Sequence, residues 1–260
     1  MAVLNRTPDS FSDGGQFLSD RKALVFAEKA LAAGATILDV GGESTRPGAS
    51  SISIQEEIRR TASIVRKIRR KFSAILSIDT RKPDVAEAAL EEGAAIINDV
   101  SGLRSNPRLA HLAARYDAGL VIVHSRGTPQ TMATLTHYED LIGEIQSELD
   151  HAMAVAEEEG LSREKLILDP GIGFAKTADQ SYSLMKHLRE LHRLGRPLLV
   201  GPSRKSFLGD RLNLTPRERL PGTLASVALA VASGAHIVRV HDVESCLHAC
   251  RIADAIVNAA

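Results

Sequence analysis

The chain has 260 residues, a length typical of one large α/β domain or two small ones. Apolar residues make up 44% and charged residues 25%, which excludes a disordered or fibrous chain. Lys and Arg together number 32, as do Asp and Glu, so the formal net charge is zero. Because nucleic acids and anionic membranes bind basic surfaces, we expect neither as a partner. A local phosphate site needs only a few cations and stays possible.

The cellular location is predicted from three features. Met1–Asp13 lacks the charged segment and apolar core of a signal peptide. Cys246 and Cys250 are too few for a disulfide framework or a zinc ribbon. The long uncharged stretch Pro221–Val238 contains Pro, Gly, Ser and His, which indicates a helix followed by a strand rather than a membrane span. We therefore expect a soluble, cytoplasmic protein.

Short apolar runs alternate with longer segments of helical period along the whole chain. The expected strands are Ala2–Leu4, Thr36–Val40, Ala74–Ile78, Ala95–Asn98, Gly119–Val123, Lys165–Leu168, Pro197–Val200 and His236–Val240. The expected helices are Arg21–Ala33, Ile54–Lys71, Pro83–Glu92, Pro107–Tyr116, Tyr138–Glu159, Ser181–Leu194, Leu220–Ser233 and Glu244–Asn258. Eight such units predict an α/β fold, a (β/α)8 TIM barrel in a single domain spanning residues 1–260. An open doubly wound sheet is the alternative, but no G-x-G-x-x-G follows the first strand.

Polar side chains mark nearly every expected strand end. They are Asn5, Glu43, Asp79, Asn98 with Asp99, His124, Asp169, Ser203–Lys205, and Arg239 with His241. In a barrel these ends converge on one face, where active sites lie. A structural role as caps or buried, paired polar groups explains one or two of them, but not eight.

Cations and acids on this face indicate two kinds of recognition. The cations are Arg46, Arg204, Lys205, Arg239 and His241, and loops after late barrel strands often bind phosphate. Ser203–Ser206 also precedes an expected short helix, so we infer a phosphate or pyrophosphate group on the substrate. Asp79, Asn98 and Asp169 lack transition-metal spacing and suit a heterocycle with several N–H donors. A paired-carboxylate hydrolase is not excluded by these residues.

Two loops supply a third signal. The segments 5–15 (N-R-T-P-D-S-F-S-D-G-G) and 42–49 (G-E-S-T-R-P-G-A) are dense in turn residues. Phe11 lies within the first, Phe174 within G-I-G-F-A-K-T, and Phe207 follows Lys205. Because the chain has only nine aromatic residues, three near this face indicate walls or lids for a flat ligand.

Together these segments resemble the dihydropteroate synthase family of folate biosynthesis, the target class of sulfonamides. The resembling motifs are L-N-R-T-P-D-S-F-S-D-G-G, G-G-E-S-T-R-P-G-A, S-I-D-T, I-I-N-D-V-S-G, R-G-T-P-Q-T-M, L-D-P-G-I-G-F-A-K-T, G-P-S-R-K-S-F-L-G and R-V-H-D-V, from Val3 to Val243. The resemblance implies a transferase that joins 6-hydroxymethyl-7,8-dihydropterin diphosphate to 4-aminobenzoate and releases diphosphate. It also implies a TIM barrel and a homodimer formed through the late helices.

The family's site residues carry over to matching positions of this chain. The resemblance implies pterin binding by Asp79, Asn98, Asp169 and Lys205, and diphosphate binding by Asn5, Arg46, Arg239 and His241. It implies that Asn5 contacts Mg²⁺, and that the aminobenzoate is framed by Thr45, Pro47, Phe174 and Ser206. Phe11 and Asp13 would close over the site in a lid loop. The implied catalytic residues are Asp79, Asp169, Lys205 and Arg239.

The implied mechanism is elimination before substitution, with no protein nucleophile. The chain departs from the family's usual pattern at Arg6, Val123–Ser125 and Ser181, none of which is an expected catalytic group. One rival is a methyltetrahydrofolate methyltransferase, which would share the pterin pocket but needs no diphosphate cations. The other is a catalytically silent pterin-binding protein, against which the intact cations argue.

Overall fold

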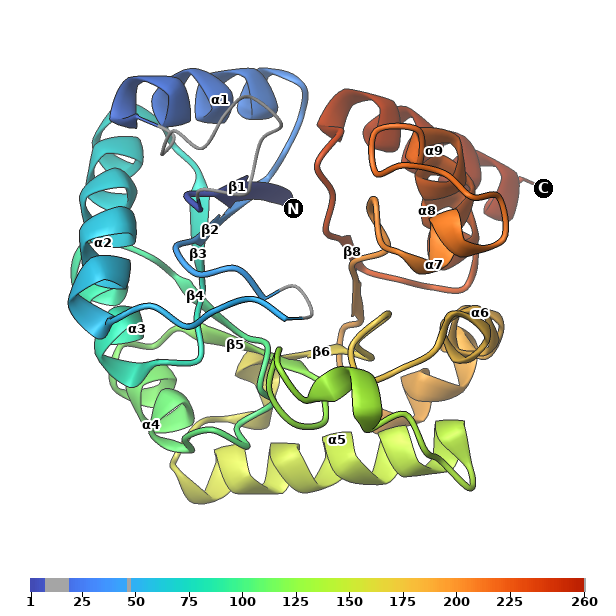
Figure 1. The fold of residues 1–260 in the computed structure, drawn as a ribbon. Helices are drawn as coiled ribbons and strands as arrows, with labels where there is room; N and C mark the ends of the chain where they lie inside the picture. The colour runs from blue at the N-terminus through green and yellow to red at the C-terminus, as the bar shows by residue number, and fades with distance from the viewer. Residues whose placement is uncertain (8–18, 46–47, 260) are drawn as a thin grey trace.

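The computed structural model describes residues 1–7, 19–45 and 48–259. Parallel strands form the centre of the molecule and helices surround them (Figure 1). The strands are β1 (Ala2–Asn5), β2 (Ile37–Gly41), β3 (Ile75–Asp79), β4 (Ile96–Asp99), β5 (Gly119–Val123), β6 (Leu166–Asp169), β7 (Leu199–Val200) and β8 (Ile237–Val238). Each described strand lies within two residues of its expected place, and β7 and β8 are shorter than expected.

The barrel closes through two narrow seams. Strands β1 to β6 form one parallel sheet in sequence order, and β7 pairs with β8. A single parallel bridge joins Leu168 to Leu198, and another joins Ala2 to Val240. At the second seam, Val3 N donates to Val240 O at 3.0 Å. Every strand therefore has a neighbour on both sides, which confirms the (β/α)8 barrel.

The α-helices follow the expected segments closely. They are α1 (Asp20–Ala32), α2 (Ile54–Lys71), α3 (Pro83–Glu91), α4 (Arg108–Arg115), α5 (Leu141–Glu158), α6 (Ala178–Lys186), α7 (Phe207–Asp210), α8 (Leu220–Ala232) and α9 (Val243–Val257). The expected helix Ser181–Leu194 is instead α6 followed by a 3-10 helix, Leu188–Leu194. There the carbonyl of Glu190 accepts from Gln146 Nε2 at 2.9 Å, a contact with α5 that helical periodicity does not reveal. No described helix is long and apolar enough to span a membrane.

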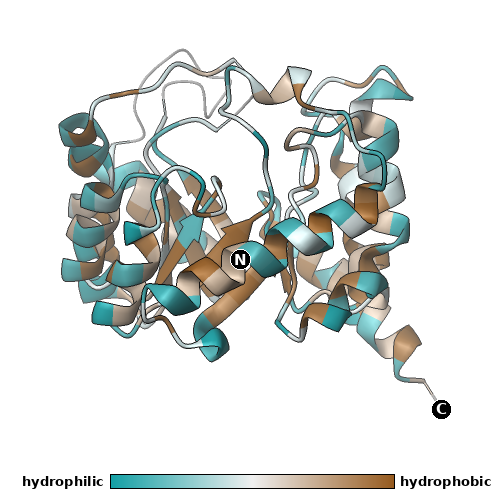
Figure 2. Cartoon of the chain, turned by 90° about the horizontal axis from the view of Figure 1, so that it is seen from below, coloured by the Kyte–Doolittle hydropathy of each residue, from teal (hydrophilic) through white to brown (hydrophobic). Residues whose placement is uncertain are grey.

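Alternation along the strands separates the core from the site. In β2, Leu38 and Val40 are buried in the layer between strands and helices, and Asp39 between them points to the opposite side. In β3, Leu76 and Ile78 are in the same layer, which leaves Asp79 on the barrel interior. The strands are largely hydrophobic, whereas hydrophilic and hydrophobic residues alternate along the helices (Figure 2). Burial of the outward side chains thus fixes which polar groups point inward.

Candidate active site

A buried cluster of charged and amide groups lies inside the barrel. Arg239, just after β8, donates from Nε to Asp39 Oδ2 at 2.7 Å and from Nη2 to Asp79 Oδ2 at 2.6 Å. Asn98, in β4, donates from Nδ2 to Asp39 Oδ2 at 3.0 Å. The Asp39 side chain is fully buried and that of Asp79 is 4% exposed. Strands far apart in sequence thus converge on one polar cluster.

Three acceptor atoms of this cluster have no hydrogen-bond partner in the described structure. They are Asp39 Oδ1, Asp79 Oδ1 and Asn98 Oδ1, all buried. Native proteins rarely leave buried polar atoms unpaired, and such atoms often mark a binding site. Carboxylate and carboxamide oxygens accept, so the group that completes this cluster must supply N–H or O–H donors.

A second set of groups surrounds Asp169 at the end of β6. Gly171 N donates to Asp169 Oδ1 at 2.7 Å. Lys205 Nζ donates to the carbonyl oxygen of Ile172 and lies 4.4 Å from the centre of the Phe174 ring. An acid, a cation and an aromatic face therefore lie together at the carboxyl end of β6 and β7.

Burial shifts the pKa values of these groups. Loss of water raises the pKa of Asp79, because Arg239 offsets only part of that effect. It also raises the pKa of Asp169, although Lys205 acts in the opposite direction. Burial lowers the pKa of Lys205 to about 8, with Asp169 opposing the shift. Perturbed acids and a perturbed base in one cluster are typical of functional sites.

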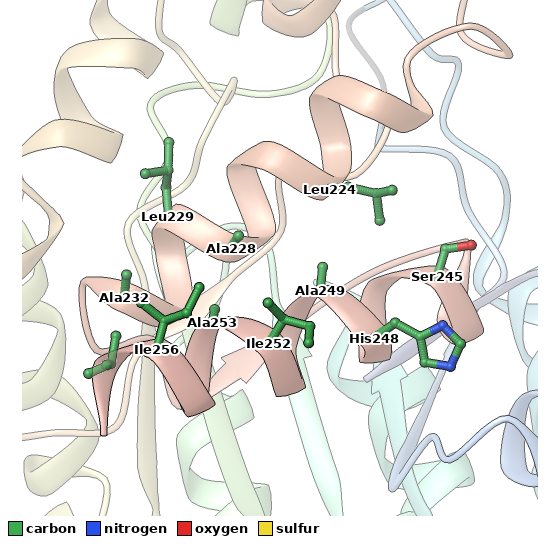
Figure 3. A pocket seen from close by; sticks show the side chains of 11 residues that line it. Leu224, Ala228, Leu229, Ala232, Ser245, His248, Ala249, Ile252, Ala253 and Ile256 are labelled. Carbon is green, nitrogen blue, oxygen red and sulfur yellow. The ribbon is translucent and has the colours of Figure 1, made fainter. Parts of the chain in front are cut away.

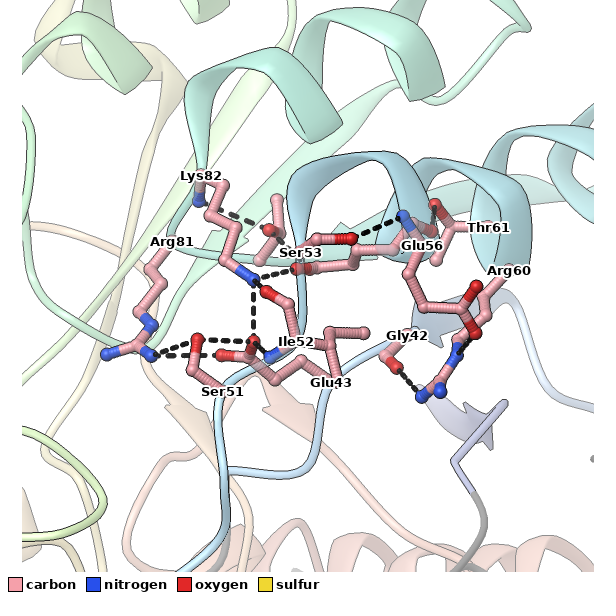
Figure 4. A network of polar contacts seen from close by, with 12 residues as sticks. Gly42, Glu43, Ser51, Ile52, Ser53, Glu56, Arg60, Thr61, Arg81 and Lys82 are labelled. Atoms are coloured by element: carbon pink, nitrogen blue, oxygen red, sulfur yellow. Dashed lines mark hydrogen bonds and ion pairs between the residues drawn. The ribbon is translucent and has the colours of Figure 1, made fainter.

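The loop after β2 is tied at its base by a buried carboxylate. Glu43 accepts from Ile52 N at 2.9 Å and from Lys82 Nζ at 2.6 Å (Figure 4). Lys82 also donates to Glu57 at 2.7 Å, and Arg81 donates to Glu43 at 3.0 Å. The side chains of Glu43 and Glu57 are 8% and 1% exposed. This ion-pair network holds together the two ends of the loop that carries Thr45.

Other predicted residues lie around the two clusters. A methyl group on Gly41 would approach Asn5 Oδ1 to 3.1 Å and Asp79 Cβ to 3.6 Å, so both side chains lie beside Gly41. His241 Nδ1 is 2.9 Å from Ser203 Oγ. Thr45 and Phe174 line one small groove, and Ser206 immediately precedes the four-residue helix α7. Four predicted residues lie outside the described part of the chain: Phe11, Asp13, Arg46 and Pro47.

Arg204, one of the cations expected at this face, has a different partner. Its Nε donates to Asp242 Oδ2 at 2.9 Å, and its Nη2 pairs with Asp242 Oδ1. This fork geometry uses the guanidinium to connect the loop after β7 with the start of α9. The structure therefore gives Arg204 a bridging role between two loops.

Two residues that the structure places at the site were not predicted from the sequence. Asp39 lies inside an apolar strand rather than at its end, and Lys176 lies within a recognised motif without an assigned role. For Asp39 a signal existed, since an acid between Leu38 and Val40 is unusual in a buried strand. For Lys176 the sequence held no signal, and its burial, at 8% exposure, is visible only in the structure.

Among residues 1–7, 19–45 and 48–259, no group of three or more His, Cys, Asp or Glu could hold a metal ion. Asn5 offers one carboxamide oxygen close to Asp79. Mg²⁺ commonly keeps several waters and binds substrate phosphates with only one or two protein oxygens. Asn5 is therefore the described residue that could contribute a protein oxygen to such an ion.

The fold and the site together define a TIM-barrel enzyme for a small, donor-rich substrate. Comparison with known proteins specifies it further. Residues 1–241 match the family described as pterin binding enzyme. A dihydropteroate synthase of Synechocystis is 49% identical over 257 residues, covering 98% of this chain and 89% of the relative. The chain is a transferase that belongs to the dihydropteroate synthase family.

Solved structures of the family agree with this placement. The Yersinia pestis dihydropteroate synthase in complex with a sulfonamide drug has a TM-score of 0.95 and 41% identity, covering 100% of this chain and 94% of that one. The Xanthomonas albilineans enzyme with 4-aminobenzoic acid has a TM-score of 0.92 and 36% identity, covering 100% and 93%. The predicted fold and family are therefore confirmed.

Proposed function

We propose that this chain condenses 6-hydroxymethyl-7,8-dihydropterin diphosphate with 4-aminobenzoate to give 7,8-dihydropteroate and diphosphate, a step of folate biosynthesis. The observation that carries the proposal is the set of unpaired buried oxygens on Asp39, Asp79 and Asn98. A pterin ring has several N–H donors, and each charge-assisted hydrogen bond contributes about 1.5–3 kcal/mol. Lys205 is close enough to Asp79, Asp169 and Arg239 to interact with their charges, which supports placing it and Asp169 in the same pocket.

The proposed mechanism uses these groups to stabilise charge. Electron density from the dihydropterin ring expels diphosphate, and the aryl amine attacks the resulting cationic methylene. Asp79 and Asp169 stabilise positive charge spread over the ring, while Lys205 donates to a ring acceptor. The barrel interior excludes water, which otherwise would capture the cation. The proposed catalytic residues are Asp79, Asp169, Lys205 and Arg239.

The diphosphate is proposed to lie above the pterin, at the mouth of the barrel. Asn5 and His241 flank this region, and Arg239 lies beneath it with its Nε and Nη2 engaged by Asp39 and Asp79. Arg46 is a further proposed contact. Mg²⁺, when bound, would neutralise charge on the leaving diphosphate, with Asn5 as the protein's contact.

The aminobenzoate is proposed to lie between two loops. Thr45 and Phe174 line the same groove, which supports a shared contact with the aromatic ring. Pro47 and Ser206 are the other proposed contacts, and Phe11 and Asp13 the proposed lid. Since the Xanthomonas relative binds 4-aminobenzoic acid and the Yersinia relative a sulfonamide, we propose that sulfonamides compete with aminobenzoate here.

The direct test is to measure diphosphate release from the pterin diphosphate with Mg²⁺, with and without 4-aminobenzoate. The proposal predicts release with dihydropteroate formation, and loss of both in Asp169→Ala and Lys205→Ala. Tight pterin binding without release would support a silent pterin-binding protein instead. An absence of pterin binding would contradict the pocket itself.

We also propose a homodimer formed through α8 and α9. These helices present an apolar face, of which Leu229, Ile252 and Ile256 are 63%, 63% and 71% exposed (Figure 3). Ala228, Ala232 and Ala249 lie between them and allow close approach of a second copy. Exposed apolar surface of this kind commonly marks a subunit interface, and two-fold dimers are the commonest assembly.

Light scattering during gel filtration tests the dimer. Ile252→Glu is expected to yield monomers because it places a charge on the face. Leu212→Glu changes an equally exposed residue, 67% exposed and outside α8 and α9, and should leave the dimer intact. A monomeric wild-type chain would contradict the proposal.

A cytoplasmic location is also proposed, supported by the unbridged Cys246 and Cys250.

A further inference from the structure

The loop that carries Phe174 has a strained, closely packed backbone. Gly171, Gly173 and Ala175 have φ angles of 71°, 74° and 47°. A methyl group on Gly171 would lie 1.8 Å from the carbonyl oxygen of His124, so the two loops are in direct contact there. Glycine adopts this left-handed region freely, but Ala175 does so only when surrounding groups hold it there. The groups that hold this loop therefore decide where the Phe174 ring lies.

One of these groups is a buried lysine that the proposed mechanism does not use. Lys176 Nζ donates to the carbonyl oxygen of Phe174 at 3.0 Å and lies 2.9 Å from His124 Nδ1. Tyr138 supports the same turn, because its hydroxyl donates to the carbonyl oxygen of Ala175 at 3.1 Å. Burying an ammonium is unfavourable for stability unless it gains strong partners. In this structure, the buried Lys176 gains hydrogen-bonding contacts that hold the loop in place.

A chain of contacts fixes the position of Lys176. When Lys176 is charged its ammonium only donates, so His124 Nδ1 accepts and the imidazole proton lies on Nε2. His124 Nε2 lies 3.0 Å from Glu148 Oε2, although this contact is not a well-aligned hydrogen bond and Nε2 has no other partner in the described structure. Arg126 donates from Nε to Glu148 Oε1 at 3.1 Å, and Arg104 also pairs with Glu148. The lysine is thus connected through His124 and Glu148 to the half-buried Arg126 and the exposed Arg104.

The charged groups around this chain are consistent with that tautomer. Burial lowers the pKa of His124 to about 4, with Lys176 adding to the effect, so the imidazole is neutral at neutral pH. Burial alone would raise the pKa of Glu148, but His124 and Arg126 outweigh it and bring the value to about 2. Burial lowers the pKa of Lys176 to about 7, with Asp169 opposing the shift. The Glu148 carboxylate, the neutral His124 imidazole and the Lys176 side chain therefore lie in contact in that order.

We propose that Lys176, held in place by His124 and Glu148, is a positioning residue that fixes the Phe174 wall of the aminobenzoate subsite. The inference rests on the proposed function, because it assigns Phe174 to that subsite. It gives the buried G-F-A-K-T lysine a role in binding the second substrate rather than the pterin. Asp169, by contrast, retains the Gly171 N–H and Lys205 when Lys176 is replaced.

A double-mutant cycle between Lys176→Met and Phe174→Leu tests this inference. Steady-state kinetics would give kcat and the KM for each substrate. Lys176→Met should raise the KM for 4-aminobenzoate by about tenfold, the size of one lost hydrogen bond, and change the KM for the pterin diphosphate less than about twofold. In the Phe174→Leu background the same change should add less than about twofold, because the wall is already removed.

Lys165→Met is the matched control. This exposed lysine precedes β6 at the opposite end of the barrel, where it pairs with Asp117, and its replacement should leave both KM values within about twofold. Should Lys176→Met fail to fold, His124→Asn replaces it in the cycle, with a smaller rise in the same KM and the same coupling to Phe174.

The outcomes separate the two claims. Additive effects in the cycle, or equal rises in both KM values, would overturn the positioning role while leaving the synthase reaction intact. A wild-type chain that forms no dihydropteroate would overturn the proposed function and this inference with it. Coupling confined to the aminobenzoate KM would support both.

Discussion

The two parts of the barrel differ in both structure and charge. Strands β1 to β6 pair along their length in one sheet, whereas β7 and β8 pair over two residues and join the rest through single bridges. The long part supplies the acceptors Asp39, Asp79, Asn98 and Asp169, and the segments after β7 and β8 supply the cations Lys205 and Arg239. The regular sheet thus carries the carboxylates, which are unfavourable to bury alone. The segments that follow the short strands carry the cations that compensate them.

This division explains how the chain places several carboxylates inside one barrel. Buried acids are tolerated when cations and hydrogen bonds compensate them, and Arg239 reaches both Asp39 and Asp79. The compensation is incomplete, since Asp39 Oδ1, Asp79 Oδ1 and Asn98 Oδ1 remain without a partner. The remaining need for donors is what we propose the pterin meets. A change in one part of the barrel should therefore alter the stability or the binding that the other part supports.

The largest effect is expected from removing the shared cation. Arg239→Met leaves Asp39 and Asp79 buried without their counterion, and the free energy of unfolding should fall by about 3–5 kcal/mol. Urea denaturation measures this change. Adding Asp39→Asn should restore part of the stability, because one uncompensated charge is removed. Unchanged stability of Arg239→Met would contradict the proposed compensation.

Neutralising an acceptor should weaken pterin binding without such a large loss of stability. Asp79→Asn and Asp169→Asn each replace an acceptor oxygen with an amide donor, and the pterin affinity should fall by about 10–100-fold. Equilibrium titration with the pterin diphosphate provides the measurement. Asp84→Asn, at an exposed position in the first turn of α3, is the control and should bind as the wild type does.

The pH dependence of pterin affinity should reflect both parts of the barrel. Burial lowers the pKa of Lys205 to about 8, so its ammonium donor is present below that pH and lost as the pH rises through it. Burial raises the pKa of Asp169, so its carboxylate acceptor is lost as the pH falls through that raised value. Affinity should therefore decline on both sides of an optimum. Titrations at increasing pH should show the alkaline decline in the wild type and not in Lys205→Met.

A smaller effect is expected at the base of the loop after β2. Lys82→Met removes the cation between Glu43 and Glu57, so the loop that carries Thr45 loses part of its anchor. The KM for 4-aminobenzoate should rise by about three- to tenfold, because a loosened contact weakens substrate positioning. Lys71→Met, an exposed lysine at the end of α2, should leave this KM unchanged. Equal KM values for Lys82→Met and the wild type would show that the Lys82 ion pairs do not position this loop for substrate binding.

The fold was largely predictable because its signals are local. Helix α2 has the predicted bounds Ile54–Lys71, since Ser53 caps its start and its buried face has a clear helical period. The ends of β7 and β8 were not predictable, because pairing over two residues is decided by neighbours across the barrel. The 3-10 turn after α6 likewise depends on a contact with Gln146 that no local pattern encodes.

The site was predictable at strand ends and less so inside the strands. Asp79, Asn98, Asp169 and Lys205 were expected, and the structure places Asp79 and Asn98 in one cluster and Asp169 close to Lys205. Asp39 was missed because its main partner, Arg239, is 200 residues away in the sequence. The link from Lys176 to His124 spans 52 residues and involves two motifs that were interpreted separately. Long-range pairing of this kind becomes visible only once the barrel closes.

A crystal structure of the chain with the pterin diphosphate bound would test the central claim most directly. We expect pterin N–H groups within about 2.7–3.2 Å of Asp39 Oδ1, Asp79 Oδ1 or Asn98 Oδ1, with Lys205 on the opposite side of the ring. These unpaired oxygens would then have the donors they lack here. A pterin bound elsewhere, with these oxygens bound only to water, would contradict the account.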